Sequence, residues 1–228
     1  MKPFRCLAAE LAQANDQRRK DAYPDLLKVH RCLSLYMKTL AVLAGDRTFT
    51  LPKQPDDLAA EIKAHADLGL DAQQVDSYSN LSRIVANGLA SGCQQKAVRE
   101  MLRQGDPPLQ TLLGGMGTLV GYYRKTNENE KRTVLGLLET EIPYVDTPKD
   151  RLLATLAKAH LQAKIQEYEL TDARYAEAER GLKAIQEGHR KLAESADNLS
   201  GEEARLAISA FTKDIKAIRN DLQALHSW

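Results

Sequence analysis

The chain has 228 residues, of which 43% are hydrophobic and 28% charged, with one tryptophan and three phenylalanines. A chain of this length buries a core without disulfides or a structural metal. A composition rich in alanine and leucine and poor in aromatic residues favours helices over a β-sandwich, so we expect an all-α protein. The 32 basic and 31 acidic residues exclude a strong overall field that would steer the molecule towards nucleic acid or an anionic membrane.

The first helix-forming stretch runs from Phe4 to about Lys20, either as a separate helix or as the first arm of a helix kinked at Pro24. Apolar residues spaced three and four apart then run from Leu26 to Leu43. This spacing predicts a buried helix that ends at Gly45.

The basic triplet Arg18, Arg19 and Lys20 lies in a segment, residues 1–55, that holds ten basic and five acidic residues. Such a triplet is ordinarily a solvated helix face. The alternative is a patch that binds a polyanion, nucleic acid included.

The middle of the chain predicts short helices separated by turns. One covers Asp56 to Leu68, and Asp71 with Gln74 is a capping box that opens a second helix. That helix ends at Gly88 or Gly92. The other expected elements are a helix over 94–104, a glycine-rich helix over 106–125, a polar turn over 126–130 and a last helix ending near residue 143.

The last third of the chain predicts a long helix. Thr147 and Pro148 are a cap and a proline at the first helical position. From there no proline interrupts the sequence until about Ala196, although continuity through Thr171 stays open.

The final helix carries the most regular apolar pattern, a coiled-coil seam. Because the intervening turn is short, it should lie antiparallel to the preceding helix, with Leu192 facing Ala204 and Tyr168 facing Trp228. We therefore predict an N-terminal bundle of short helices, 1–145, and a long antiparallel coiled-coil-like hairpin, 146–228, packed as one unit. The seam consists of Ala204, Ile208, Phe211, Ile215, Ile218, Leu222 and Leu225.

The run Leu112–Tyr123 holds four glycines in twelve residues. A tightly packed core helix is the ordinary interpretation. The alternative is the apolar head of a helical pore-forming toxin, which contacts a membrane after a conformational change. The candidate contact residues for a membrane or a partner are Leu112, Leu113, Met116, Gly117, Leu119, Val120, Gly121 and Tyr122.

One spacing points to catalysis. Arg219 and Asn220 are followed by His226, and this pattern resembles the R-x(4-6)-H motif of HEPN ribonucleases, a helical family. The resemblance implies that His226 transfers a proton and Arg219 contacts the RNA phosphate without a metal.

Metal and cofactor chemistry are not indicated. Cys6, Cys32 and Cys93 have no metal-binding or disulfide spacing, and the five histidines form no HExxH or Glu-x-x-His motif. We predict no metal, no cofactor and no small-molecule substrate, and, without an apolar leader or transmembrane run, a cytoplasmic location.

A non-catalytic interaction or assembly protein is therefore the favoured function, with a partner protein or a second copy as ligand. The long helix extends past its return helix from Thr147 to about Lys164. An apolar stripe on that extension must be covered by the bundle or by another chain.

Overall fold

The computed structural model describes residues 4–45, 61–91, 95–198 and 201–224, and within them the side chains of 4–12, 91, 95, 201, 214 and 217–224 are left out of the description. Its elements are α1 (Phe4–Leu43), the 3₁₀ turn η1 (Ala66–Leu68), α2 (Ala72–Ser91), α3 (Gln95–Val145), α4 (Arg151–Ser195) and α5 (Gly201–Ala224). Across these ranges the structure contains no strand, only an isolated bridge between His65 and Leu70. The all-α class is confirmed.

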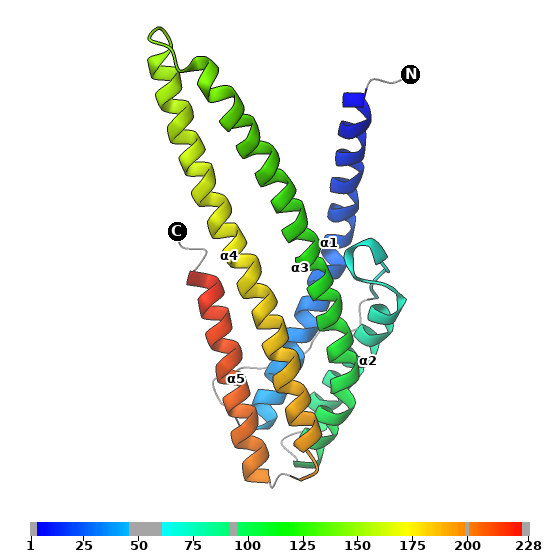
Figure 1. Cartoon of the computed structure of the whole chain (residues 1–228). Helices are drawn as coiled ribbons and strands as arrows, with labels where there is room; N and C mark the ends of the chain where they lie inside the picture. The colour runs from blue at the N-terminus through cyan, green and yellow to red at the C-terminus, as the bar shows by residue number, and fades with distance from the viewer. Residues whose placement is uncertain (1–3, 46–60, 92–94, 199–200, 225–228) are drawn as a thin grey trace.

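Two long helices organise the molecule. Figure 1 shows α3 and α4 side by side and antiparallel, with α2, α5 and the second half of α1 gathered around one end of the pair. The other end of the pair projects beyond these neighbours. A long antiparallel hairpin is present, but its two helices are α3 and α4, whereas the sequence placed it within residues 146–228.

Helix α1 is one helix of 40 residues with Pro24 inside it, so the stretch before the proline is an arm of the same helix. Its end at Gly45 is confirmed. Gly45 has φ 91°, in the left-handed region, and donates its N–H to the carbonyl of Val42 at 2.9 Å. Glycine adopts this conformation without the steric penalty of a side chain.

The predicted helix over 56–68 is wrong for its described part, because residues 61–65 are not helical. The segment is held instead by Asp25 of α1. Its carboxylate accepts from the backbone N–H of Lys63 at 3.3 Å and faces His65 Nε2 at 3.1 Å. In this way the backbone N–H of Lys63 and the ring of His65 bond to a side chain of α1 and do not need the hydrogen bonds of a helix. Ile62 in the same segment is buried.

The capping box of α2 is confirmed. The Asp71 carboxylate accepts from the backbone N–H of Gln73 at 2.7 Å and of Gln74 at 3.3 Å, and Gln74 Oε1 accepts from the Asp71 N–H at 3.0 Å. The helix passes through Gly88 and ends at Ser91.

The segments predicted as short helices over 94–143 are helical where described, but the predicted breaks between them, the turn over 126–130 included, are wrong, because α3 is one helix of 51 residues. The polar stretch 126–130 stays helical because its side chains bond to α4. Asn127 Nδ2 donates to Asp172 Oδ1 at 3.2 Å, and Glu130 Oε1 accepts from the Tyr168 hydroxyl at 3.2 Å. The prolines inside α3 are Pro107, Pro108 and Pro143.

Helix α4 is continuous through Thr171, a point that the sequence left open. It begins at Arg151, three residues after Pro148, which was the expected first helical residue. Thr147 caps nothing; its hydroxyl donates to Asp150 Oδ2 at 3.1 Å and braces the turn before the helix.

The end of α4 packs against α5 as the seam predicted, since Leu192 and Ala204 are both buried. A Cβ added at Gly188 would meet the Phe211 ring at 2.7 Å, which shows how closely the two helices approach. Most of α4, however, lies along α3 (Figure 1). Tyr168 accordingly bonds to α3, and Trp228 lies outside the described residues.

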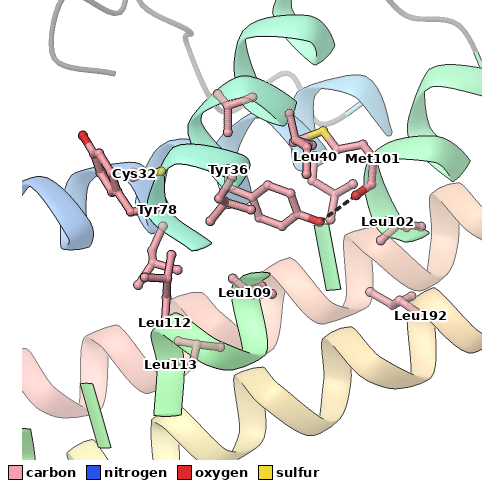
Figure 2. Packing of buried hydrophobic residues seen from close by; sticks show 14 of the residues in the cluster. Cys32, Tyr36, Leu40, Tyr78, Met101, Leu102, Leu109, Leu112, Leu113 and Leu192 are labelled. Atoms are coloured by element: carbon pink, nitrogen blue, oxygen red, sulfur yellow. Dashed lines mark hydrogen bonds between the residues drawn. The ribbon is translucent and has the colours of Figure 1, made fainter. Parts of the chain in front are cut away.

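One buried cluster joins all five helices. Figure 2 shows the Tyr36 ring of α1 among leucines of α3 and α4, with its hydroxyl pointing to the Met101 carbonyl. On α3 the buried cluster ends at Leu113. Its least exposed large members are Tyr36, Leu40, Leu81, Leu102, Leu109, Leu112 and Ile208.

Candidate functional site

Beyond the buried cluster, α3 and α4 form a two-helix arm, residues 119–145 and 151–180. Its inner seam contains the buried side chains of Ile142, Ala154 and Tyr168. Polar contacts fix the register along it: Lys131 Nζ lies 2.7 Å from Asp172 Oδ2. The arm is therefore an ordered pair with a single thin layer of apolar contact.

The far end of the arm exposes large apolar side chains, which we call the apolar tip: Leu137, Tyr144, Leu152, Leu153 and Leu156. Their exposed fractions are 60, 76, 74, 53 and 60%, so more than half of each side chain faces solvent. Scattered exposed leucines are ordinary, whereas these five large apolar side chains all lie at one end of a projecting arm. Three of the five belong to the segment from Thr147 to Lys164, which the sequence indicated as lacking cover.

The two sides of the arm can be told apart by their polar contacts. On one side Lys158 Nζ lies 2.6 Å from Asp146 Oδ2. Glu130, the acceptor of the Tyr168 hydroxyl, is sixteen residues before Asp146. At roughly 100° per residue this places Glu130 on nearly the opposite face of α3.

Four members of the tip lie on the side marked by Glu130. Leu137 and Tyr144 follow Glu130 at intervals of seven and so share its face of α3. On α4, Leu153 and Leu156 are turned well over 90° from Lys158, at roughly 100° per residue. Leu137 and Tyr144 therefore share a face of α3, and Leu153 and Leu156 lie on one side of α4.

The charges around the tip are mixed. Between residues 137 and 158 all charged side chains are exposed, and four are acidic and three basic. The acidic ones are Glu139, Glu141, Asp146 and Asp150, and the basic ones are Lys149, Arg151 and Lys158.

The glycine-rich run lies partly inside the core. Leu112 and Leu113 are 1 and 3% exposed, and Met116 packs against the core. By contrast, a Cβ added at Gly117 or Gly121 would meet nothing within 4 Å. The remaining candidates, Leu119, Val120 and Tyr122, are half-buried.

In the basic triplet Arg18 and Lys20 are exposed and Arg19 is half-buried, and all three have acidic neighbours. Lys20 Nζ lies 2.7 Å and Arg19 Nη2 3.5 Å from Asp16, and Arg18 Nη1 lies 3.7 Å from Asp67. These carboxylates offset much of the positive potential that a polyanion would require.

The structure does not describe the side chains of the ribonuclease-like motif. Arg219 and Asn220 lie on α5, but their side chains, and all of His226, fall outside the described part of the structure.

A buried polar chain is the feature that the sequence interpretation missed. His189 has no exposed surface; its Nε2 lies 2.7 Å from the Tyr36 hydroxyl, and its Nδ1 lies 2.8 Å from Asp106 Oδ1. A signal existed, since His189 falls four residues after Ile185 and three before Leu192, on the apolar stripe. Its partners could not be read from the sequence, because they come from α1 and α3.

The buried surroundings of His189 and Tyr36 shift the pKa of both side chains. Burial lowers the pKa of His189 more than the hydrogen bond and charge of Asp106 raise it. Burial, together with Asp106, raises the pKa of Tyr36. Because no solvent reaches the ring, the arrangement is a structural link and offers no place for a substrate.

A hollow of about 520 Å³ lies at the start of α3, where charges of both signs offset one another. Arg103 Nη1 lies 3.6 Å from Asp197 Oδ1. The lining residues are Lys96, Arg99, Glu100, Arg103, Gln104 and Asp197.

Among the described residues no three His, Cys, Asp or Glu side chains gather as metal ligands would. A search of the described helices for one with the length and apolar character to cross a membrane finds none. No family model, curated protein or solved structure matches the chain.

Proposed function

We propose that the protein is a non-catalytic assembly protein that associates with a second copy of itself through the apolar tip. The main observation in support of this proposal is that large apolar side chains are exposed at the end of an ordered arm. They are Leu137, Tyr144, Leu152, Leu153 and Leu156. Burying one such side chain contributes roughly 1.5–3 kcal/mol, so covering several of them supports association.

The mixed charges favour a second copy over a lipid surface. A two-fold pair brings the same surface of both molecules together, so each acid can face a base of the other copy. Glu139 and Lys149 are examples of such opposite charges near the tip. An anionic membrane would instead repel a tip with one more acid than bases.

The order of the arm also supports the proposal. Because Lys131–Asp172 and Lys158–Asp146 hold the two helices in register, the tip needs little rearrangement to bind. A preorganised surface loses less conformational entropy on association than a flexible one.

Sedimentation velocity over a range of protein concentrations tests the proposal. We expect the wild-type chain to form a dimer in the micromolar range and Leu152→Glu/Leu156→Glu to remain a monomer with an unchanged circular dichroism spectrum. The matched control is Leu206→Glu, because Leu206 is 65% exposed but lies on α5. This control should dimerise as the wild type does.

A wild-type chain that stays monomeric into the hundreds of micromolar would contradict the proposal. So would a double variant that still dimerises. Dye release from vesicles of anionic lipid, lost in Gly117→Arg while the variant stays folded, would instead support the pore-forming alternative.

A further inference from the structure

The hydrogens of the buried chain can be counted. Asp106 accepts a second hydrogen bond, from Gln110 Nε2 at 3.0 Å. A carboxylate in this position requires a donor at His189 Nδ1. In the neutral ring Nε2 is then an acceptor, and the Tyr36 hydroxyl gives it its single hydrogen.

The same atoms accommodate one more proton. With a proton on Nε2, the ring donates to both partners, and the Tyr36 hydroxyl turns its hydrogen to the Met101 carbonyl at 3.1 Å. The hydrogen-bonded group of Tyr36, His189 and Asp106 therefore has two complete hydrogen-bond arrangements that differ by one proton. The charged arrangement places an imidazolium where water does not reach it.

Every helix packed against the ring has a defined role in this balance. Helix α1 contributes the Tyr36 hydroxyl, and α3 contributes the Asp106 carboxylate. From α5 the uncharged Phe211 ring packs edge-on, with 6.3 Å between centroids. On α4 itself the charged neighbours Glu187 and Arg190 are exposed. Among the described residues, Asp106 is thus the one charged group hydrogen-bonded to the ring.

We propose that His189 is a pH-sensitive joint that holds the long α3–α4 pair to α1 and loosens on acidification. His189, on α4, contacts α1 through Tyr36 and α3 through Asp106. Protonation of His189 therefore affects the contacts at the point where the three helices meet. This proposal is independent of self-association, because it concerns the base of the molecule.

The direction of the pH effect follows from the lowered pKa of His189. The folded chain binds this proton less readily than the unfolded chain, whose histidines titrate near about 6.5. The stabilisation from neutral His189 is therefore complete above that pH. It is lost as the pH falls from there through the lower, folded value.

Direct titration of the ring is the first measurement. In the ¹⁵N spectrum of histidine-labelled wild type, we expect His189 to be the Nδ1–H tautomer at pH 8 and to titrate below 6.5. Single replacement of His30, His65, His160 and His226 by Gln assigns the other four signals. A ring that titrates above 6.5, or that never titrates while the fold persists down to pH 4, overturns the proposal.

Asp106→Asn separates a proton-linked role from a purely structural one. A neutral amide removes the charge that favours imidazolium, so the His189 titration should move to still lower pH. In denaturant unfolding, the midpoint of the wild type should fall between pH 7.5 and pH 5. The midpoint of His189→Gln should fall less over the same range. If the wild type and a folded His189→Gln lose the same amount, the joint is not the sensor.

Discussion

The base of the molecule and the arm are built from the same two helices, yet they differ in what they bury. At the base, Leu102, Leu109 and Leu112 of α3 are at most 1% exposed, because α1, α2, α4 and α5 surround them. In the arm, Leu137 and Tyr144 of the same helix are 60 and 76% exposed. One neighbour covers one stripe of a helix, and several neighbours are needed to cover more.

This contrast indicates which part of the molecule contributes most to its stability. The base has the deep core and the close contacts, so it carries the folding free energy. The arm has one thin seam, polar pairs and an uncovered end, so changes at its tip should alter association and leave folding intact.

The largest expected contrast is between two leucines. Leu109→Ala should lower the free energy of unfolding by about 2–5 kcal/mol, because it opens a cavity in a packed core. Leu156→Ala should change it by less than about 0.5 kcal/mol in the monomer. Urea denaturation followed by circular dichroism, at concentrations that keep the chain monomeric, measures both. Equal losses would mean that the arm carries as much of the core as the base.

Two tyrosines sharpen the contrast. Tyr36→Phe leaves His189 Nε2 without its buried partner and should cost about 1–3 kcal/mol. Tyr168→Phe removes a hydroxyl that bonds to the exposed Glu130, where water replaces it, and should cost less than about 1 kcal/mol. Thermal unfolding of the two variants checks this. The reverse order would contradict the assignment of the buried chain to the base.

Two glycines should respond with opposite signs. Gly188→Ala places a methyl group against the Phe211 ring, and we expect a net loss of about 1–2 kcal/mol in the free energy of unfolding. Gly117→Ala meets open space in a helix and should gain about 0.5–1 kcal/mol. Denaturant midpoints of both variants give the sign directly. A gain for Gly188→Ala would show that α5 approaches α4 less closely than the structure has it.

The smallest effect is expected for an ion pair of the arm. The hydrogen bond from Lys131 to Asp172 is the main cause that raises the pKa of Lys131. Asp172→Asn should lower the unfolding midpoint slightly, and about 1 M salt should remove most of that difference, because it screens exposed charges. The loss in Leu109→Ala should persist in salt. A difference that salt leaves unchanged would point to packing at Asp172.

Local signals were sufficient where the cause lies within a few residues. The carboxylate of Asp71 caps the helix that begins at the next residue, and Gly45 ends α1 in a left-handed conformation.

Predictions failed where the cause lies on another helix. The stretch 126–130 has the composition of a turn, yet Asp172 and Tyr168 of α4 hold it in α3. The candidate surface was half predicted: the uncovered start of α4 was expected, but Leu137 and Tyr144 were not. The role of His189 could not be predicted, because its two partners are 83 and 153 residues away in the sequence.

Local sequence is sufficient to predict that this protein is helical, where several helices begin or end, and which stripes along them are apolar. These properties depend on side chains within one helical turn of each other. Packing between helices decides that α3 lies along most of α4, that a histidine joins three helices, and that the arm ends in exposed leucines. Which stripes are covered depends on how many helices reach them, and that number is set by packing across the whole chain.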